Sequence, residues 1–101
     1  KKMALKFDGK FLKDGSKTLC NVKANKIYEG SGPFKALANI QGDNIYKGSG
    51  PFKVLANIKG DKIYEGSGSF KVLIKTSDAA RKIGATSRGP LTAAIWYLFC
   101  K

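Results

Sequence analysis

Two columns of a repeated sequence hold the residues whose types and spacing could do chemistry. One column is tyrosine and the other is lysine, and within each column the interval is 18 residues: Tyr28, Tyr46, Tyr64, Lys35, Lys53 and Lys71. Tyrosine rings stack on bases and lysines contact phosphates, a composition typical of a surface that binds single-stranded nucleic acid. In the alternative interpretation, the tyrosines pack between repeats and the lysines solvate the exterior.

Other chemistries find little support in the residue types. The chain has no histidine, which excludes Ser-His-Asp and Cys-His catalysis and the usual histidine ligands of zinc and haem. Cys20 and Cys100 have no partner at metal-ligand spacing. We therefore expect no catalytic residues, no metal site and no cofactor, and no small-molecule substrate is evident. The protein is expected not to be an enzyme.

Glycine and aspartate recur in the turns of the repeat. The Gly-Ser-Gly segments at 30–32, 48–50 and 66–68 could bind an anion through converging backbone N–H groups, but no P-loop sequence follows them. Asp43 and Asp61 recur at one turn position, where paired carboxylates could act as acid and base. Tight turns account for both patterns without a functional role.

The chain is strongly basic. Its 101 residues include 19 Lys and Arg against 7 Asp and Glu, a formal net charge of +12, and the excess lies toward the two ends of the sequence. Such a charge favours nucleic acid or an anionic membrane surface as a partner, although it also promotes solubility. Two widely separated cysteines form no disulfide framework, so we expect buried free thiols and a cytoplasmic location. Charged residues from Lys6 to Lys10 interrupt any apolar region typical of a signal peptide.

The repeated phrase is Ile-Tyr-x-Gly-Ser-Gly-x-Phe-Lys-x-Leu, which begins at Ile27, Ile45 and Ile63. Blocks 27–44 and 45–62 match at 14 of 18 positions. A degenerate copy precedes them, in which Phe11-Leu12-Lys13 aligns with Ile27-Tyr28-Glu29 and two residues are lost around the turn. The sequence therefore predicts a single domain, 1–101, with four copies at 11–26, 27–44, 45–62 and 63–80.

Each copy contains two strand-like runs, so we predict a mainly β fold of four β-hairpin repeats. In the run from Phe52 to Ile58, alternation places Phe52, Val54, Ala56 and Ile58 on one face and Lys53, Leu55 and Asn57 on the other. Units this small cannot bury an apolar face alone, and closure around a pseudo-fourfold axis removes exposed strand edges. The aromatic column Phe34, Phe52 and Phe70 is predicted to fill the space between units.

The segment 77–101 is predicted to be helical. Ser77 is the expected N-cap of a short helix that ends near Gly84, and Pro90 is the expected first residue of a second helix. The second helix is apolar on nearly every side, so it requires burial, either against the β-domain or in a partner. The candidate contacts for a partner or a second copy are Leu91, Ile95, Trp96, Leu98 and Phe99. Trp96 and Tyr97 also suit a membrane interface, although the apolar run is too short to span a bilayer.

The repeated Ile-Tyr-x-x-x-Gly units and the Gly-Asp turns at 42–43 and 60–61 resemble those of the bacterial 4-fold beta flower domain. The short apolar tail that contains Trp96 is also similar to that of some members, and the resemblance covers roughly residues 5–101. It implies four β-hairpin petals around an axis. It implies no established activity, cofactor or catalytic residue.

These observations favour a non-enzymatic structural or interaction module that associates with itself through the apolar tail. Nucleic-acid binding at the tyrosine and lysine columns is the first alternative. Peripheral membrane association through the tail is the second. Self-association predicts a mass that depends on concentration, whereas nucleic-acid binding predicts an affinity that falls steeply with salt.

Overall fold

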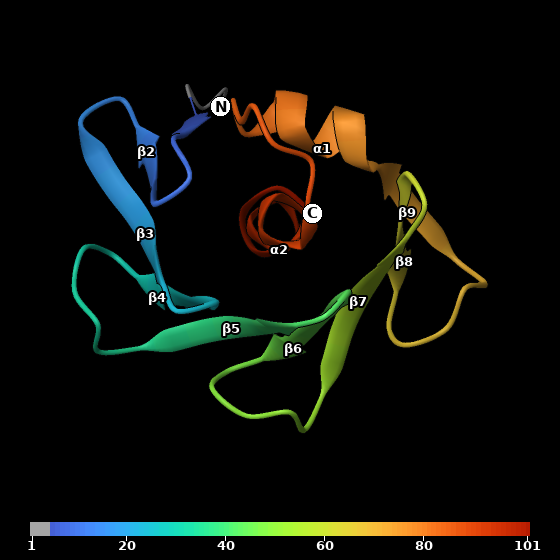
Figure 1. Ribbon diagram of the computed structural model, residues 1–101. Helices are drawn as coiled ribbons and strands as arrows, with labels where there is room; N and C mark the ends of the chain where they lie inside the picture. The colour runs from blue at the N-terminus through green and yellow to red at the C-terminus, as the bar shows by residue number, and fades with distance from the viewer. Residues whose placement is uncertain (1–4) are drawn as a thin grey trace.

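A computed structural model describes residues 5–101 and shows one strongly curved antiparallel sheet around a helix (Figure 1). Each strand pairs with the next in the chain, so the order in the sheet is the order in the sequence. The nine strands of the described chain are β1 (Leu5–Phe7), β2 (Phe11–Asp14), β3 (Lys17–Lys23), β4 (Lys26–Glu29), β5 (Ala36–Gln41), β6 (Asn44–Lys47), β7 (Val54–Lys59), β8 (Lys62–Glu65) and β9 (Val72–Lys75). Two helices follow, α1 (Thr76–Lys82) and α2 (Pro90–Phe99).

The sheet is open, and a helix covers the gap between its edges. Strands β1 and β9 are the two edges, and α1 lies between them in Figure 1. Gly84 follows α1 with a φ of 64°, and a Cβ at this position would overlap the carbonyl oxygen of Leu5. This close backbone approach holds the end of α1 against β1. The β prediction is confirmed, but the predicted closure of four repeats around a pseudo-fourfold axis is not.

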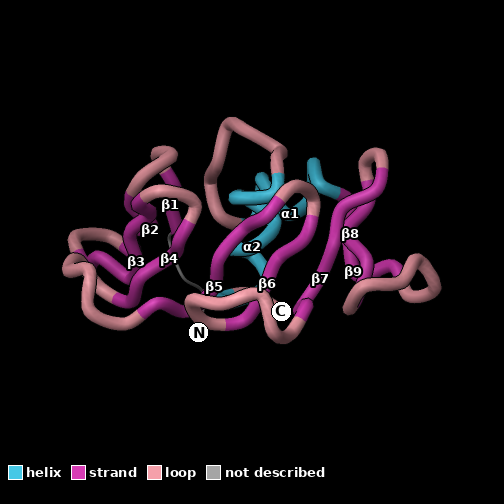
Figure 2. Tube along the Cα trace, turned by 60° about the horizontal axis from the view of Figure 1, so that its bottom comes forward, coloured by secondary structure: helices cyan, strands magenta, loops and turns pink. Residues whose placement is uncertain are grey.

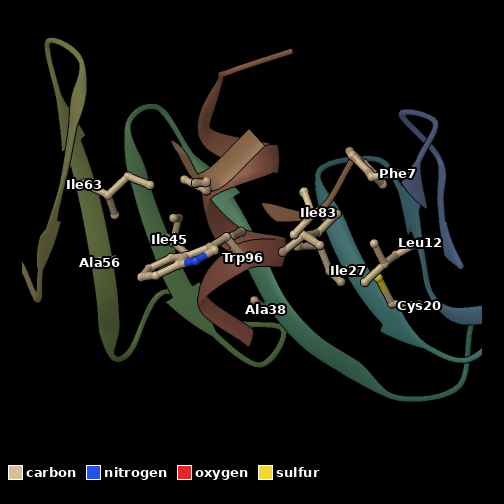
Figure 3. Packing of buried hydrophobic residues seen from close by; sticks show 14 residues of the cluster. Phe7, Leu12, Cys20, Ile27, Ala38, Ile45, Ala56, Ile63, Ile83 and Trp96 are labelled. Atoms are coloured by element: carbon tan, nitrogen blue, oxygen red, sulfur yellow. The ribbon is translucent and has the colours of Figure 1, made fainter. Parts of the chain in front are cut away.

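Helix α2 runs through the centre of the curved sheet and forms the core with its inner face. Ile95 and Trp96 of α2 are 0% and 6% exposed. Around them stands an inward row of fully buried side chains, one from each even-numbered strand: Leu12, Ile27, Ile45 and Ile63. Small residues on the paired strands let the sheet approach the helix, as Ala38 does opposite Ile27 and Ala56 opposite Ile45. Figure 3 shows these side chains gathered around α2.

The first copy of the repeat lies in a different register from the one predicted. Leu12 pairs with Cys20 in the way that Ile27 pairs with Ala38, and a register shift follows each of the two pairs. Leu12, not Phe11, is therefore the counterpart of Ile27. Leu12 and Cys20 are 8 positions apart in the sequence, whereas Ile27 and Ala38 are 11 positions apart. The first copy is therefore three residues shorter than the later ones, not two. The predicted alignment was wrong because it matched apolar residue types without the pleat, which turns Phe11 outward.

A β-bulge in each later repeat disturbs the predicted alternation. Ala56 lies opposite Ile45, but Val54 lies opposite Tyr46, which leaves Leu55 as the extra residue. Leu55 packs against the core, so its predicted placement on the face opposite Ala56 is wrong. The bulge adds local twist and bends the strand, which helps the sheet curve around α2.

The phenylalanine column is exposed and does not fill the space between units. Phe34, Phe52 and Phe70 are 93%, 92% and 97% exposed. Each precedes its strand, since β5, β7 and β9 begin two residues later. Each ring instead lies over a glycine of its own loop, where a Cβ at Gly32 would come within 2.6 Å of the Phe34 ring.

A column of buried asparagines, which the sequence analysis missed, anchors these loops. Asn39 is 4% exposed, and its Nδ2 donates to the carbonyl oxygens of Gly48 (2.9 Å) and Gly50 (3.1 Å). Asn21 and Asn57 hold the loops at 30–32 and 66–68 in the same way. Because an unpaired buried carbonyl group is costly, the asparagine is what lets each loop fold back on the sheet.

The helix boundaries differ from the prediction at one end. Helix α1 begins at Thr76 after Lys75, with no side-chain cap, so the prediction of Ser77 as N-cap is wrong. The Thr76 backbone N–H donates to the carbonyl oxygen of Asp61 (2.8 Å), so the helix starts directly from the strand ladder. The prediction for Pro90 is confirmed, since it is the first residue of α2.

The central position of α2 predicts the result of a truncation. A chain that ends at Gly89 should not fold, because the inward row would lose the helix that covers it. Circular dichroism and light scattering on the truncated chain would measure this, with a chain that lacks only Lys101 as the control. A folded monomer at Gly89 would contradict the role of α2 as the core.

A substitution borrowed from the neighbouring repeat should stabilise the protein. Gln41 Nε2 donates to Asn39 Oδ1 (3.1 Å), but Lys59 occupies the equivalent position beside Asn57, whose buried Oδ1 has no partner among the described residues. Lys59→Gln should therefore raise the free energy of unfolding by about 0.5–1.5 kcal/mol. Urea denaturation would measure the change. Lys62→Asn removes a neighbouring charge without supplying that donor, and an equal gain from it would contradict the explanation.

Candidate nucleic-acid interface

The predicted tyrosines lie on the outer face of the sheet. Tyr28, Tyr46 and Tyr64 are half-buried, and each pairs across the ladder with an anchoring asparagine, as Tyr46 does with Asn39. Their rings therefore stand beside the folded-back loops, with part of each side chain accessible.

The predicted lysines lie at the ends of the loops, and two of them have acidic partners. Lys35 Nζ is 3.9 Å from Glu29 Oε1, and Lys71 Nζ is 3.2 Å from Glu65 Oε1. Glu29 lines a cavity beside the end of α2, whereas the preceding residue, Tyr28, faces outward. Lys35 and Lys71 are therefore drawn toward glutamates rather than toward the tyrosine rings.

Lys53 differs from its two counterparts. Its loop begins with Lys47, where the neighbouring repeats have Glu29 and Glu65. Its backbone carbonyl accepts a hydrogen bond from the Lys47 N–H (2.8 Å), so the two lysines lie at the same loop neck. The middle loop is therefore the most basic of the three.

The residues predicted for a partner contact are largely part of the protein itself. Ile95 and Trp96 are buried in the core, so the prediction that these two contact a partner requires correction. Leu91, Leu98 and Phe99 are half-buried and pack against the same core. The apolar character of the tail is explained by burial against its own sheet.

A basic surface that the sequence analysis did not single out covers the outer face of β1 to β4. Lys6 lies directly opposite Lys13, and Lys23 directly opposite Lys26. Within the described chain, no ion pair joins any of these four lysines to an acid. Like charges directly opposite each other destabilise a sheet, so two such pairs favour a surface that is neutralised by an anionic partner.

Phe11 stands at the centre of this surface. Lys10 Nζ lies 5.4 Å and Lys13 Nζ 5.8 Å from the centroid of its ring, which places two ammonium groups within cation–π distance. We call the set the Phe11 surface: Phe11, Lys6, Lys10, Lys13, Lys23 and Lys26. A sequence signal for it did exist, since residues 1–26 are rich in lysine, but the register error hid the outward direction of Phe11.

Two hollows flank the Phe11 ring, which lines both of them. One, of about 290 Å³, is lined by Lys10 and Lys23 together with the loop residues Ser31 and Pro33. The other, of about 280 Å³, is lined by Lys6, Lys13 and Asp8. The ring therefore forms a ridge with a lysine-lined space on either side.

Asp8 is the acidic residue beside this ridge, and its carboxylate is engaged in a turn. Asp8 Oδ1 accepts hydrogen bonds from the backbone N–H groups of Phe11 (2.7 Å) and Lys10 (2.9 Å), and these bonds hold the pKa of Asp8 below its usual value. The carboxylate thus fixes the turn that carries Lys10 and Phe11. Its charge offsets one of the surrounding lysines.

A further cavity, of about 410 Å³, lies elsewhere, beside the end of α2. Its floor is apolar, from Leu19, Leu37, Leu98 and Phe99, and the ionisable residues that line it are Lys17 and Glu29. Ligand sites usually add several converging polar groups that fix orientation, and these two charges alone do not provide them.

The described residues provide the means to bind an anion but no arrangement for metal chemistry. No group of three or more His, Cys, Asp or Glu within residues 5–101 is placed to hold a metal ion. In the same range, neither helix has the length and apolar character needed to cross a membrane.

Comparison with known proteins gives one family. A family model described as 6-fold beta flower protein matches residues 1–96. The resemblance to a beta flower domain is thereby confirmed, with six-fold in place of the expected four-fold description. Searches of curated proteins and of solved structures give no match.

The two cysteines differ in accessibility, which predicts a difference in reactivity. Burial raises the pKa of the Cys20 thiol to about 12, while Cys100 is only half-buried and therefore departs from the expected pair of buried thiols. Because the thiolate is the reactive form, a thiol reagent at pH 8 should label Cys100 first and Cys20 only after unfolding. Mass spectrometry of the wild type and of Cys100→Ser would measure this. Prompt labelling of the folded Cys100→Ser variant would contradict the burial of Cys20.

Proposed function

The chain belongs to the 6-fold beta flower family, and we propose that it is a non-catalytic module that binds single-stranded nucleic acid at the Phe11 surface. One observation carries the proposal: an outward aromatic ring with a lysine-lined hollow on each side. A base stacked on either side of the ring would have its phosphate within reach of an ammonium group.

The shape of the surface favours a single strand over a duplex. Unpaired bases can splay out and stack on an aromatic side chain, whereas the stacked bases of a duplex offer only their edges in the grooves. Phe11 is half-buried, so its position is fixed while one part of the ring remains accessible. Tyr28, two strands away on the same face, offers a second ring along the surface.

The charges of the surface predict a strong dependence on salt. If all five lysines contact phosphates, the slope of log K against log salt would be roughly −3.5, at about −0.7 per neutralised phosphate of a single strand. Affinity would then fall roughly 100-fold between 50 and 200 mM salt. A protein that binds through apolar contacts alone would show little of this dependence.

The test is fluorescence anisotropy with a short labelled single-stranded oligonucleotide at several salt concentrations. Lys10→Ala with Lys13→Ala should weaken binding and make the slope shallower by roughly 1.4, since two phosphate contacts are lost. Phe11→Leu keeps an apolar side chain but removes the aromatic face, and affinity should fall roughly 5-fold or more. Thermal unfolding would check that each variant is folded.

The matched control is a charge change on a different part of the sheet. Lys59→Gln with Lys62→Asn also removes two positive charges, and both residues are those of the preceding repeat. This variant should retain most of the affinity. If it loses as much as the Lys10 and Lys13 variant, or if the wild type does not bind at low salt, the proposed site is wrong.

A further inference from the structure

The three phenylalanine loops form a second surface, which borders the Phe11 surface at Ser31 and Pro33 of the first loop, and we propose that they dock the protein on an anionic lipid bilayer. We call the segments 30–35, 48–53 and 66–71 the Phe loops. Their phenylalanines are more than nine-tenths exposed, the most exposed large apolar side chains of the described chain. Three such residues at the same repeat position are unlike scattered surface hydrophobics, which need no explanation.

All three Phe loops lie at the same end of the sheet. Each follows an even-numbered strand, after β4, β6 and β8, while the short turns at 24–25, 42–43 and 60–61 lie at the opposite end. Figure 2 shows the long loops along one edge and the short turns along the other. Figure 1 shows the loops splayed around α2. The three loops therefore share one end of the sheet, and the proposal places the bilayer at that end.

The loops hold their shape before any partner binds. The Lys47 and Lys53 backbones close the neck of the middle loop (2.8 Å), and the two outer loops are closed by equivalent bonds of 2.9 Å. The anchoring asparagines fix the base of each loop, and each ring lies over its own glycine. A preorganised loop loses little conformational freedom on binding, so that more of the interaction appears as affinity.

The chemistry of the loops suits a lipid surface. A phenylalanine has no polar atom, so it can enter the acyl boundary, and the lysine that follows it in each loop can remain among the headgroups. Lys47 and Lys53 at the middle neck face no acidic counterpart like those of the outer loops. Each lysine near an anionic membrane adds to the attraction, and the formal net charge of +12 also attracts the protein to an anionic surface.

A nucleic acid fits these loops less well than it fits the Phe11 surface. Successive loops leave the sheet two strands apart, roughly 10 Å, and they diverge from there. Phe11 and Tyr28 share one continuous face of the sheet, whereas the three phenylalanines belong to separate loops that diverge, so consecutive bases of one strand cannot stack on them. A flat bilayer has no such spacing requirement.

The experiment is flotation of the full chain with vesicles of phosphatidylcholine, with or without phosphatidylserine. The wild type should float with the phosphatidylserine vesicles. Phe34→Ser, Phe52→Ser and Phe70→Ser together should reduce binding roughly 1,000-fold, at roughly tenfold for each ring withdrawn from the bilayer. Because all three side chains are exposed, the melting temperature of this variant should equal that of the wild type.

Two further variants separate insertion from general attraction between charges. Lys47→Glu gives the middle loop the same residue type as Glu29 and Glu65 in the neighbouring loops. It should weaken binding to the vesicles severalfold without affecting the fold. Phe52→Trp places a reporter in the middle Phe loop, and lipids with brominated acyl chains should quench its fluorescence, while Trp96 in the core provides a constant background.

Several results would overturn the proposal. One is failure of the wild type to bind phosphatidylserine vesicles, and another is binding that survives loss of the three rings, which would reflect charge alone. A third is an oligomer in the absence of lipid that the triple variant dissociates, because the loops would then be contacts with a second copy. The triple variant should still bind the oligonucleotide, so failure here is distinguishable from failure of the Phe11 surface.

Discussion

Burial of an apolar helix on almost every side is the constraint on which this structure depends. Every residue of α2 is buried or half-buried, so one flat sheet could not cover the helix. The sheet must curve through most of a turn, and the bulges and the small side chains of Ala38 and Ala56 permit that curvature. Helix α1 completes the enclosure where the strands end. The outer face and the loops are thereby freed from any part in the core.

The repeat period predicted the strands well because each copy carries its own turn glycines and β-forming residues. Three features could not be predicted from the period alone. The bulge at Leu55 depends on how a strand bends over a helix, the register of the first copy depends on the partner of Leu12, and the exposure of Phe52 depends on where a strand begins.

The candidate site was predicted only in its chemistry. Aromatic rings with lysines were the expected combination, and the tyrosine column does face outward, but its expected lysine partners lie at the loop necks, two of them beside acids. The lysine-rich surface is around Phe11, in the copy that repeats least well. Similarity between repeats identifies what the fold requires, whereas the differences reveal surfaces free to change. Between blocks 27–44 and 45–62, three of the four differences add positive charge.

The position of the core helix at the end of this fold affects how the chain can fold as it is synthesised. Every strand pairs with its neighbour in sequence, so hairpins can form as soon as they emerge from the ribosome. Their inner face, however, has nothing to cover it until α2 has been made. A nascent chain that stalls before Pro90 would display the isoleucine row as a continuous apolar strip, a surface that invites chaperones or aggregation. Among the elements of this fold, the one that follows all the strands in the sequence is thus the one that completes their core.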